Sequence, residues 1–169
     1  MRVSTEASVY FNLCRWLENN SLIMAMDGSI YGSAIVEVTH YIGFFLLVGS
    51  IVIVDLRLLG VVRGRPTVSQ LGEQVFPTMW TGLGLSALTG FIMFAGSATQ
   101  YYANSVFYLK LAMVLLGIVA GIVIQRNVPK WDRLSAIPAW AKLLAIVSMA
   151  LWIGAILVGV EVPAITGVG

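Results

Sequence analysis

Four long stretches of the chain are rich in apolar residues, and shorter polar or basic segments separate them. They cover approximately residues 31–59, 75–97, 106–125 and 139–160. A helix of ~20 residues, rising ~1.5 Å per residue, crosses the hydrocarbon core of a bilayer, so the pattern predicts four membrane-spanning helices. No charged residue occurs between Glu73 and Lys110, but the polar segment SATQYYANS divides this region into two spans.

The segment before the first stretch, residues 5–26, has a different pattern. Apolar residues recur there at helical spacing, and polar residues lie off that stripe: Tyr10, Leu13, Cys14 and Leu17 against Asn12, Arg15, Glu18 and Asn19. This pattern predicts a helix that lies on the membrane surface. The predicted fold class is therefore all-α: a transmembrane four-helix bundle with an N-terminal amphipathic surface helix, forming a single membrane domain over residues 1–169.

The composition supports this interpretation. Hydrophobic residues make up 59% of the chain and charged residues only 11%, and the mean hydropathy is +0.90. Soluble domains contain about 25% charged residues. These values exclude a soluble globular protein, a disordered chain and a free-standing nucleic-acid binder, and they make the lipid bilayer the first partner. Cys14 is the only cysteine, so an intrachain disulfide is excluded.

Basic residues predict the orientation of the spans. Seven of the ten lysines and arginines lie in or beside the segments that follow the first and third spans: Arg57, Arg63, Arg65, Arg126, Lys130, Arg133 and Lys142. Four spans place these two segments on the same side, which the positive-inside rule makes cytoplasmic. We therefore expect a multi-pass protein of the bacterial inner (plasma) membrane with both termini periplasmic.

The first span carries ionisable residues on one face. Glu37 and Asp55 are eighteen residues apart, which is about five helical turns and ~27 Å along the axis. His40, the only histidine, lies one turn deeper than Glu37 on nearly the same face. Ionisable groups at membrane depth are costly and usually face the interior of a bundle. We expect this face to point inward.

These residues suggest two sets of charge pairs. Lys110 and Glu161 are expected at the level of Glu37, where the three would form a charge cluster above His40. At the other end, Asp55 is expected to pair with Arg126 or Arg133. Such pairs often only neutralise each other, which would give them a structural role alone.

Metal binding is one chemical interpretation of this region. Met93 and Met113 are predicted near the depth of His40, and two thioethers with one imidazole suit Cu(I). Glu37 would be a further ligand. The alternatives are that the methionines fill gaps in an apolar core and that His40 is a hydrogen-bonded packing residue, with Glu37 or Tyr101 as its partner.

The residues available in the chain limit which other cofactors and reactions are possible. With one histidine, a bis-histidine haem within one chain is excluded, whereas a single-His haem, a His/Met haem and a haem shared across a homodimer stay open. Glu37-x-x-His40 matches one element of di-iron bundles, but the second and third spans contain no carboxylate to complete such a site. We find no nucleotide-binding loop and no hydrolytic set, and therefore predict no catalytic residues.

Small residues recur every four positions in several spans. Gly82, Ser86 and Gly90 share one face of the second span, and Gly117 and Gly121 form GxxxG in the third. Such faces allow helices to approach closely in lipid, either within the bundle or between protomers. A homo-oligomer, or a complex with another membrane protein through the Gly/Ala faces, is therefore a predicted partner arrangement.

The segment HYIGFFLLVGSIVIVDLRLLG, residues 40–60, resembles a family of uncharacterised bacterial four-span inner-membrane proteins. That family's pattern is a histidine, a pair of glycines and then Asp-Leu-Arg-Leu-Leu-Gly. CRWLENNSLI and Glu37 also match it. In layout the chain is similar to copper-resistance D-like membrane proteins and, more loosely, to cytochrome b-type bundles. The first resemblance implies copper handling at a periplasm-facing site around His40, and the second implies haem.

We therefore expect a membrane protein that binds or passes a metal ion, with copper favoured. The alternatives are a haem-bearing or structural subunit of a respiratory or electron-transfer assembly, and a self-assembling membrane oligomer.

Overall fold

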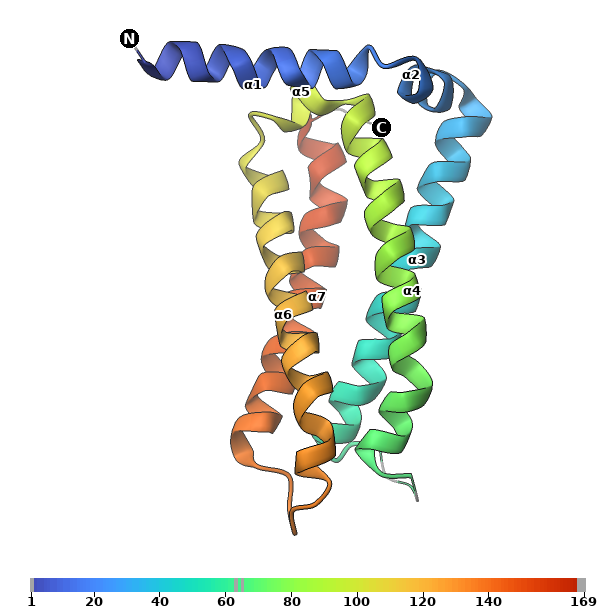
Figure 1. The fold of residues 1–169 in the computed structure, drawn as a ribbon, viewed down its shortest axis with the longest axis vertical. Coiled ribbons are helices and arrows are strands. Elements are labelled where there is room, and N and C mark those ends of the chain that lie inside the picture. Colours follow the sequence, from blue (N-terminus) through green and yellow to red (C-terminus); the bar gives the residue numbers. More distant parts are fainter. Residues whose placement is uncertain (1, 63, 65, 167–169) are drawn as a thin grey trace.

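The computed structural model describes residues 2–166 except 63 and 65, with side chains over residues 9–159 except 27, 63 and 65. Within this part the chain is helical and contains no strand, which confirms the predicted fold class (Figure 1). The helices in chain order are α1 (Arg2–Glu18), α2 (Ser21–Asp27), α3 (Ile30–Leu58), α4 (Val68–Gly96), α5 (Ala98–Tyr101), α6 (Ser105–Trp131) and α7 (Ala139–Thr166).

Helices α3, α4, α6 and α7 are long and apolar enough to cross a membrane, so the structure is that of a multi-pass membrane protein. Three of them extend beyond the predicted spans, and one of these is α7, which continues past residue 160 to Thr166. Helix α4 begins at Val68 because Thr67 and Gln70 form a capping box, in which each side chain accepts a hydrogen bond from the other's backbone N–H. Helix α6 continues past residue 125 to Trp131, and this extension adds the basic residues Arg126 and Lys130 to the helix.

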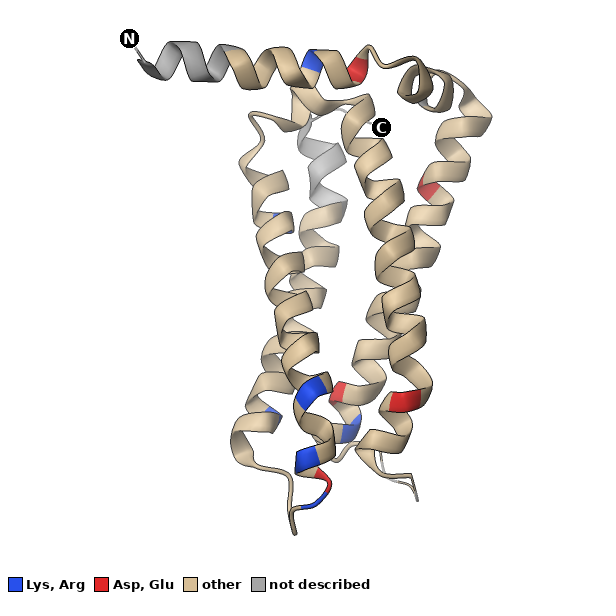
Figure 2. Ribbon diagram, in the orientation of Figure 1, with Lys and Arg blue, Asp and Glu red and all other residues tan. Residues whose placement is uncertain are grey.

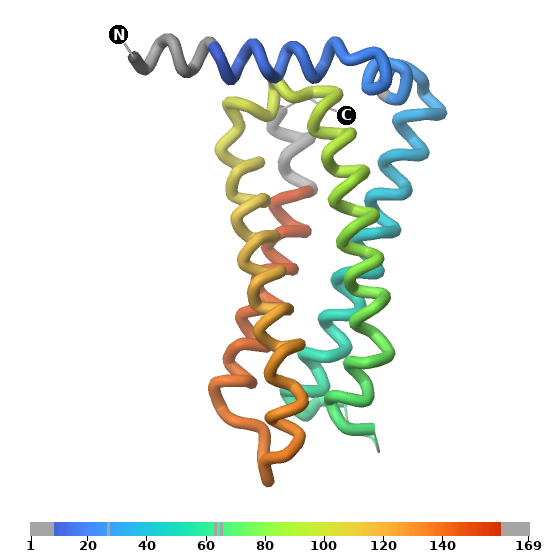
Figure 3. The backbone as a smooth tube through the Cα atoms, in the orientation of Figure 1, coloured from blue at the N-terminus to red at the C-terminus, as the bar shows by residue number. Residues whose placement is uncertain are grey.

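The predicted surface helix is two helices rather than one. Its continuity is broken between Glu18 and Ser21, where the Asn20 side chain accepts a hydrogen bond from the backbone N–H of Leu22 and caps α2. Helix α1 lies across one end of the bundle (Figures 1 and 3), and α7 extends toward the same end (Figure 1). We call this end the outer end and the opposite end the inner end.

The four long helices form two pairs. Helix α3 packs mainly against α4 and helix α6 mainly against α7, and the pairs contact each other through α3–α7 and α4–α6. Helices α3 and α4 lie close together at Gly43 and Gly82, where a Cβ atom on either glycine would lie within 2.7 Å of the other helix's backbone. The small residues of α4 are therefore used for packing inside the bundle.

The interior has two apolar layers. In the middle, Leu47, Ile51, Met79 and Trp152 are buried together, and the ring of Phe44 lies edge-on to that of Trp152 with centroids 6.0 Å apart. The layer nearer the inner end is larger and contains Val54, Leu58, Val68, Ile124, Val128, Trp131, Ala141 and Ala145. These layers separate polar groups in the outer half from those at the inner end.

The inner end holds most of the charged residues of the described chain (Figure 2). Asp132 links two helices there: its carboxylate accepts hydrogen bonds from the backbone N–H groups of Val68 (3.2 Å) and Ser69 (2.7 Å) at the start of α4. Partial burial tends to raise the pKa of Asp132, but hydrogen bonds from Ser69, Thr67 and Val68 outweigh this effect and lower it. A carboxylate at a helix N-terminus also interacts favourably with the helix dipole.

Candidate functional site

His40 lies in the outer half of α3 and is held by α4. Its Nδ1 atom is 3.0 Å from the backbone oxygen of Ser86 and 3.2 Å from the hydroxyl oxygen of Thr89. These groups take the place of the partners that we expected, Glu37 or Tyr101. The partner was difficult to predict because a helix carbonyl bonded to a side chain leaves no mark in the sequence.

The local sequence explains why the imidazole can lie against α4. Gly90 supplies the space, since a Cβ atom there would be 2.9 Å from His40 Cε1. The Thr89 hydroxyl donates to the Leu85 backbone oxygen at 2.7 Å, so its own oxygen is free to accept from His40. A carbonyl oxygen can only accept a hydrogen bond, so Nδ1 carries the proton and neutral His40 has its lone pair on Nε2.

Charged groups surround this imidazole on two sides. His40 lies within electrostatic range of Lys110 on α6 and of Glu37 on its own helix. Glu37 is exposed, whereas the Lys110 side chain lies along α7: a Cβ atom at Gly159 would be 3.4 Å from Nζ. The structure therefore brings Glu37, His40 and Lys110 into one neighbourhood. The side chain of Glu161 lies outside the described residues, so its place in the expected cluster stays a prediction.

The two candidate methionine ligands lie in different helix contacts. Met93 follows Thr89 by four residues and so lies on the face of α4 that holds His40, one turn nearer the outer end. Met113 is directed toward α7, because a Cβ atom at Gly154 would be 3.0 Å from its sulfur. His40 thus belongs to the α3–α4 contact and Met113 to the α6–α7 contact, whereas exposed Glu37 is hydrogen-bonded to Tyr41 on its own helix. Among the described residues, no three His, Cys, Asp or Glu side chains form a metal cluster.

Asp55, which was predicted to pair with Arg126 or Arg133 at the inner end, lies in a different environment from these arginines. The Asp55 side chain is fully buried, and neither of its carboxyl oxygens has a hydrogen-bond partner in the described structure. Arg126 and Arg133 are exposed. Arg57 folds onto the following loop, where its guanidinium donates to the backbone oxygens of Val62, Gly64 and Pro66.

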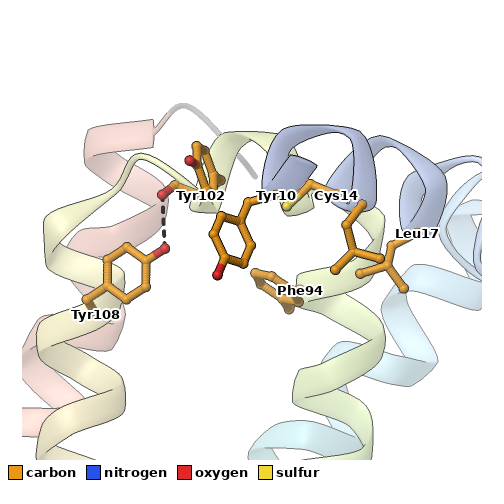
Figure 4. Close-up of a pocket in the computed structure, with 7 residues that line it drawn as sticks. Tyr10, Cys14, Leu17, Phe94, Tyr102 and Tyr108 are labelled. Carbon is orange, nitrogen blue, oxygen red and sulfur yellow. Dashed lines mark hydrogen bonds between the residues drawn. The ribbon is translucent and has the colours of Figure 1, made fainter. Parts of the chain in front are cut away.

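A pocket at the outer end was not predicted. Its volume is about 310 Å³, and it lies between α1 and the bundle (Figure 4), lined by Tyr10, Leu13, Cys14, Leu17, Phe94, Tyr102 and Tyr108. The apolar stripe of the N-terminal segment forms one wall, so the signal was present but was interpreted as membrane-facing. Glu18 holds α1 in place, because one of its oxygens accepts hydrogen bonds from both the backbone N–H and the hydroxyl of Thr99, each at 2.7 Å.

Comparison with known protein families shows one match. The model of a family of unknown function, DUF6644, covers residues 10–163. The chain belongs to this family. Membership confirms the expectation of an uncharacterised family and gives no support to a relationship with copper-resistance D-like proteins. No curated protein matches the chain, and no solved structure matches it.

Proposed function

We propose that this DUF6644 protein is a bacterial inner-membrane protein, with both termini on the periplasmic side, that binds a soft metal cation at His40. Cu(I) is the favoured ion. The haem-bearing or structural subunit and the self-assembling oligomer stay predictions. The proposed orientation is supported by the basic residues of the described chain, which concentrate at the inner end (Figure 2). Alkaline phosphatase fused after the C-terminus tests it: the fusion should be active, and an inactive but membrane-inserted fusion contradicts it.

The observation that carries the metal proposal is the hydrogen bond from His40 Nδ1 to the Ser86 backbone oxygen. Histidine ligands usually donate their second ring N–H to a carbonyl or carboxylate, which fixes the ring and directs the other nitrogen to the metal. His40 has this arrangement, and Nε2 makes no hydrogen bond with a described residue.

The neighbouring donors favour a soft ion. The thioether of Met93 is one turn from Thr89, and the carboxylate of Glu37 is about one turn from His40 on the same side of α3. Thioether and imidazole ligands select Cu(I) over hard divalent ions. Lys110 acts against any cation at this place because its positive charge lies within electrostatic range of His40. We therefore expect Lys110 to limit the affinity.

A competition titration tests the site. Purified protein in detergent is titrated with Cu(I) under reducing conditions against a coloured Cu(I) chelator. Wild type should bind one equivalent, His40→Gln should lose this binding, and Met93→Leu should weaken it. Met113→Leu is the matched control, since Met113 packs against α7, and it should bind like wild type. Binding by His40→Gln at the wild-type level, or no binding by wild type, would overturn the proposal.

A further inference from the structure

Asp55 is a buried acidic residue that the proposed metal site does not use. It lies in the last turn of α3, with an exposed fraction of 0%, and both carboxyl oxygens lack a hydrogen-bond partner among the described residues. Native proteins satisfy nearly all of their buried polar groups, so a carboxyl group in this state needs an explanation.

The surroundings of Asp55 are apolar apart from one hydroxyl. Ser148 faces it from α7, is also 0% exposed, and lies outside hydrogen-bonding geometry, so its Oγ has no partner in the described structure either. The neighbours of this pair along their own helices, Val54, Leu58 and Ala145, belong to the inner apolar layer.

No described basic side chain neutralises Asp55. The Arg57 guanidinium is bonded to three loop carbonyls, and Arg126, Lys130, Arg133 and Lys142, on or just after α6 and on α7, are exposed. Glu73 on α4 is exposed as well. Among the described groups, Ser148 is the one that acts on the Asp55 carboxyl.

A bare carboxylate in such a place costs several kcal/mol, so the group needs a cation. Ca²⁺ takes 6–8 oxygen ligands and Mg²⁺ about six, whereas this site offers two side chains. A proton requires no coordination shell, and it supplies the O–H donor for which the Ser148 oxygen is an acceptor. From this arrangement we infer that Asp55 and Ser148 form a proton-binding site inside the bundle, separate from the site at His40.

The packing also indicates the side from which the proton comes. The middle layer of Leu47, Ile51, Met79 and Trp152 closes the interior toward the outer end. Toward the inner end Asp55 is only three residues from the last residue of α3, and the apolar side chains of Leu58, Val128 and Trp131 cover that distance. The site therefore exchanges its proton with the inner aqueous phase when these side chains move apart.

Dicyclohexylcarbodiimide, an apolar reagent that enters the bilayer, tests the site. The O–H of a neutral carboxylic acid adds across one C=N bond of the reagent, and the adduct rearranges to an N-acylurea without loss of atoms. Mass spectrometry of the full-length protein in detergent should find this adduct on Asp55, and its yield should fall as the pH is raised. Asp55→Asn should abolish the adduct at this position. Glu73→Gln removes an exposed carboxyl group at the same end and should leave the yield of the Asp55 adduct unchanged.

Two further measurements separate a proton site from a structural ion pair. Asp55→Asn should unfold at the wild-type temperature, because the amide has the shape of the neutral acid and requires no counter-ion. Ser148→Ala should shift the pH range over which Asp55 is labelled, because the hydroxyl that faces the carboxyl group is lost. Absence of an adduct on wild-type Asp55 at every pH would overturn the inference. So would equal losses of stability in Asp55→Asn and Arg126→Gln, which indicate an ion pair.

Discussion

Replacing Gly82 by alanine should disturb His40 through the contact between α3 and α4. A Cβ atom at Gly82 would lie 2.6 Å from both the Gly43 backbone oxygen and the Leu47 backbone nitrogen. Non-bonded heavy atoms prefer separations of roughly 3.5 Å or more, so the helices must part by about 1 Å. The distance from His40 Nδ1 to the Ser86 oxygen, now 3.0 Å, would then reach about 4 Å, beyond hydrogen-bonding range.

The stability effect has two opposing parts. Overpacking of a close contact costs about 1–3 kcal/mol, and the higher helix propensity of alanine returns up to about 1 kcal/mol. We expect a net loss of about 1–2 kcal/mol for Gly82→Ala. Gly84 provides the matched control on the same helix, because a Cβ atom there has no neighbour within 4 Å. Gly84→Ala should therefore be neutral or slightly stabilising.

Thermal unfolding in detergent and the Cu(I) competition titration measure the two consequences separately. Gly82→Ala should lower the unfolding temperature and weaken Cu(I) binding by about tenfold or more, the usual effect of removing the group that orients a histidine ligand. Gly84→Ala should change neither. If the two variants are indistinguishable in both measurements, the reasoning that links this helix contact to His40 is refuted.

Three further perturbations have defined outcomes. Lys110→Leu should strengthen Cu(I) binding in the competition titration, because it removes a positive charge near His40 without adding a ligand; unchanged affinity would mean that the charge does not act on the site. Glu18→Gln should weaken the attachment of α1 to Thr99 and increase the rate at which maleimide labels Cys14, whose side chain is 8% exposed. Asp132→Asn should cost less than ~1 kcal/mol, since the carboxylate is largely solvated. The folded-state pKa of Asp132 is lowered. Its contribution to the free energy of unfolding should therefore be constant above the ordinary pKa of an aspartate, and it should disappear as the pH falls through the lowered pKa. A titration of unfolding temperature against pH checks this, with Asp132→Asn lacking that acid-dependent loss.

The fold could be predicted from the sequence because the bilayer favours an apolar side chain at nearly every position of a span. Hydropathy located α3, α4, α6 and α7, but the ends of these helices depend on local polar groups. Thr67 starts α4 seven residues before the predicted apolar boundary. Asn20 divides the surface helix in a similar way.

The candidate site was less predictable because it depends on how each helix is rotated. Glu37 and His40 are one turn apart on one helix, so their proximity followed from spacing alone. The sequence predicted Met93 and Met113 equally as ligands. In the structure, Met93 lies on the face of α4 that holds His40, and Met113 lies against Gly154. The sequence did not predict Ser86 and Thr89 as partners of His40. Ser86 accepts the hydrogen bond through its backbone oxygen, and Thr89 accepts through a hydroxyl oxygen whose direction depends on packing.

The pairing of neighbouring helices has a consequence for biosynthesis. Helices α3 and α4 are consecutive in the chain, so the Gly43–Gly82 contact can form before α6 and α7 have been synthesised. The group that faces Asp55, Ser148, is on α7, the last of the four long helices to be made. Until α7 enters the membrane and docks, the newly made protein presents an uncovered carboxyl group at membrane depth. That group distinguishes an unfinished or misassembled molecule from a mature one, and it is a feature that membrane-protein quality control can recognise.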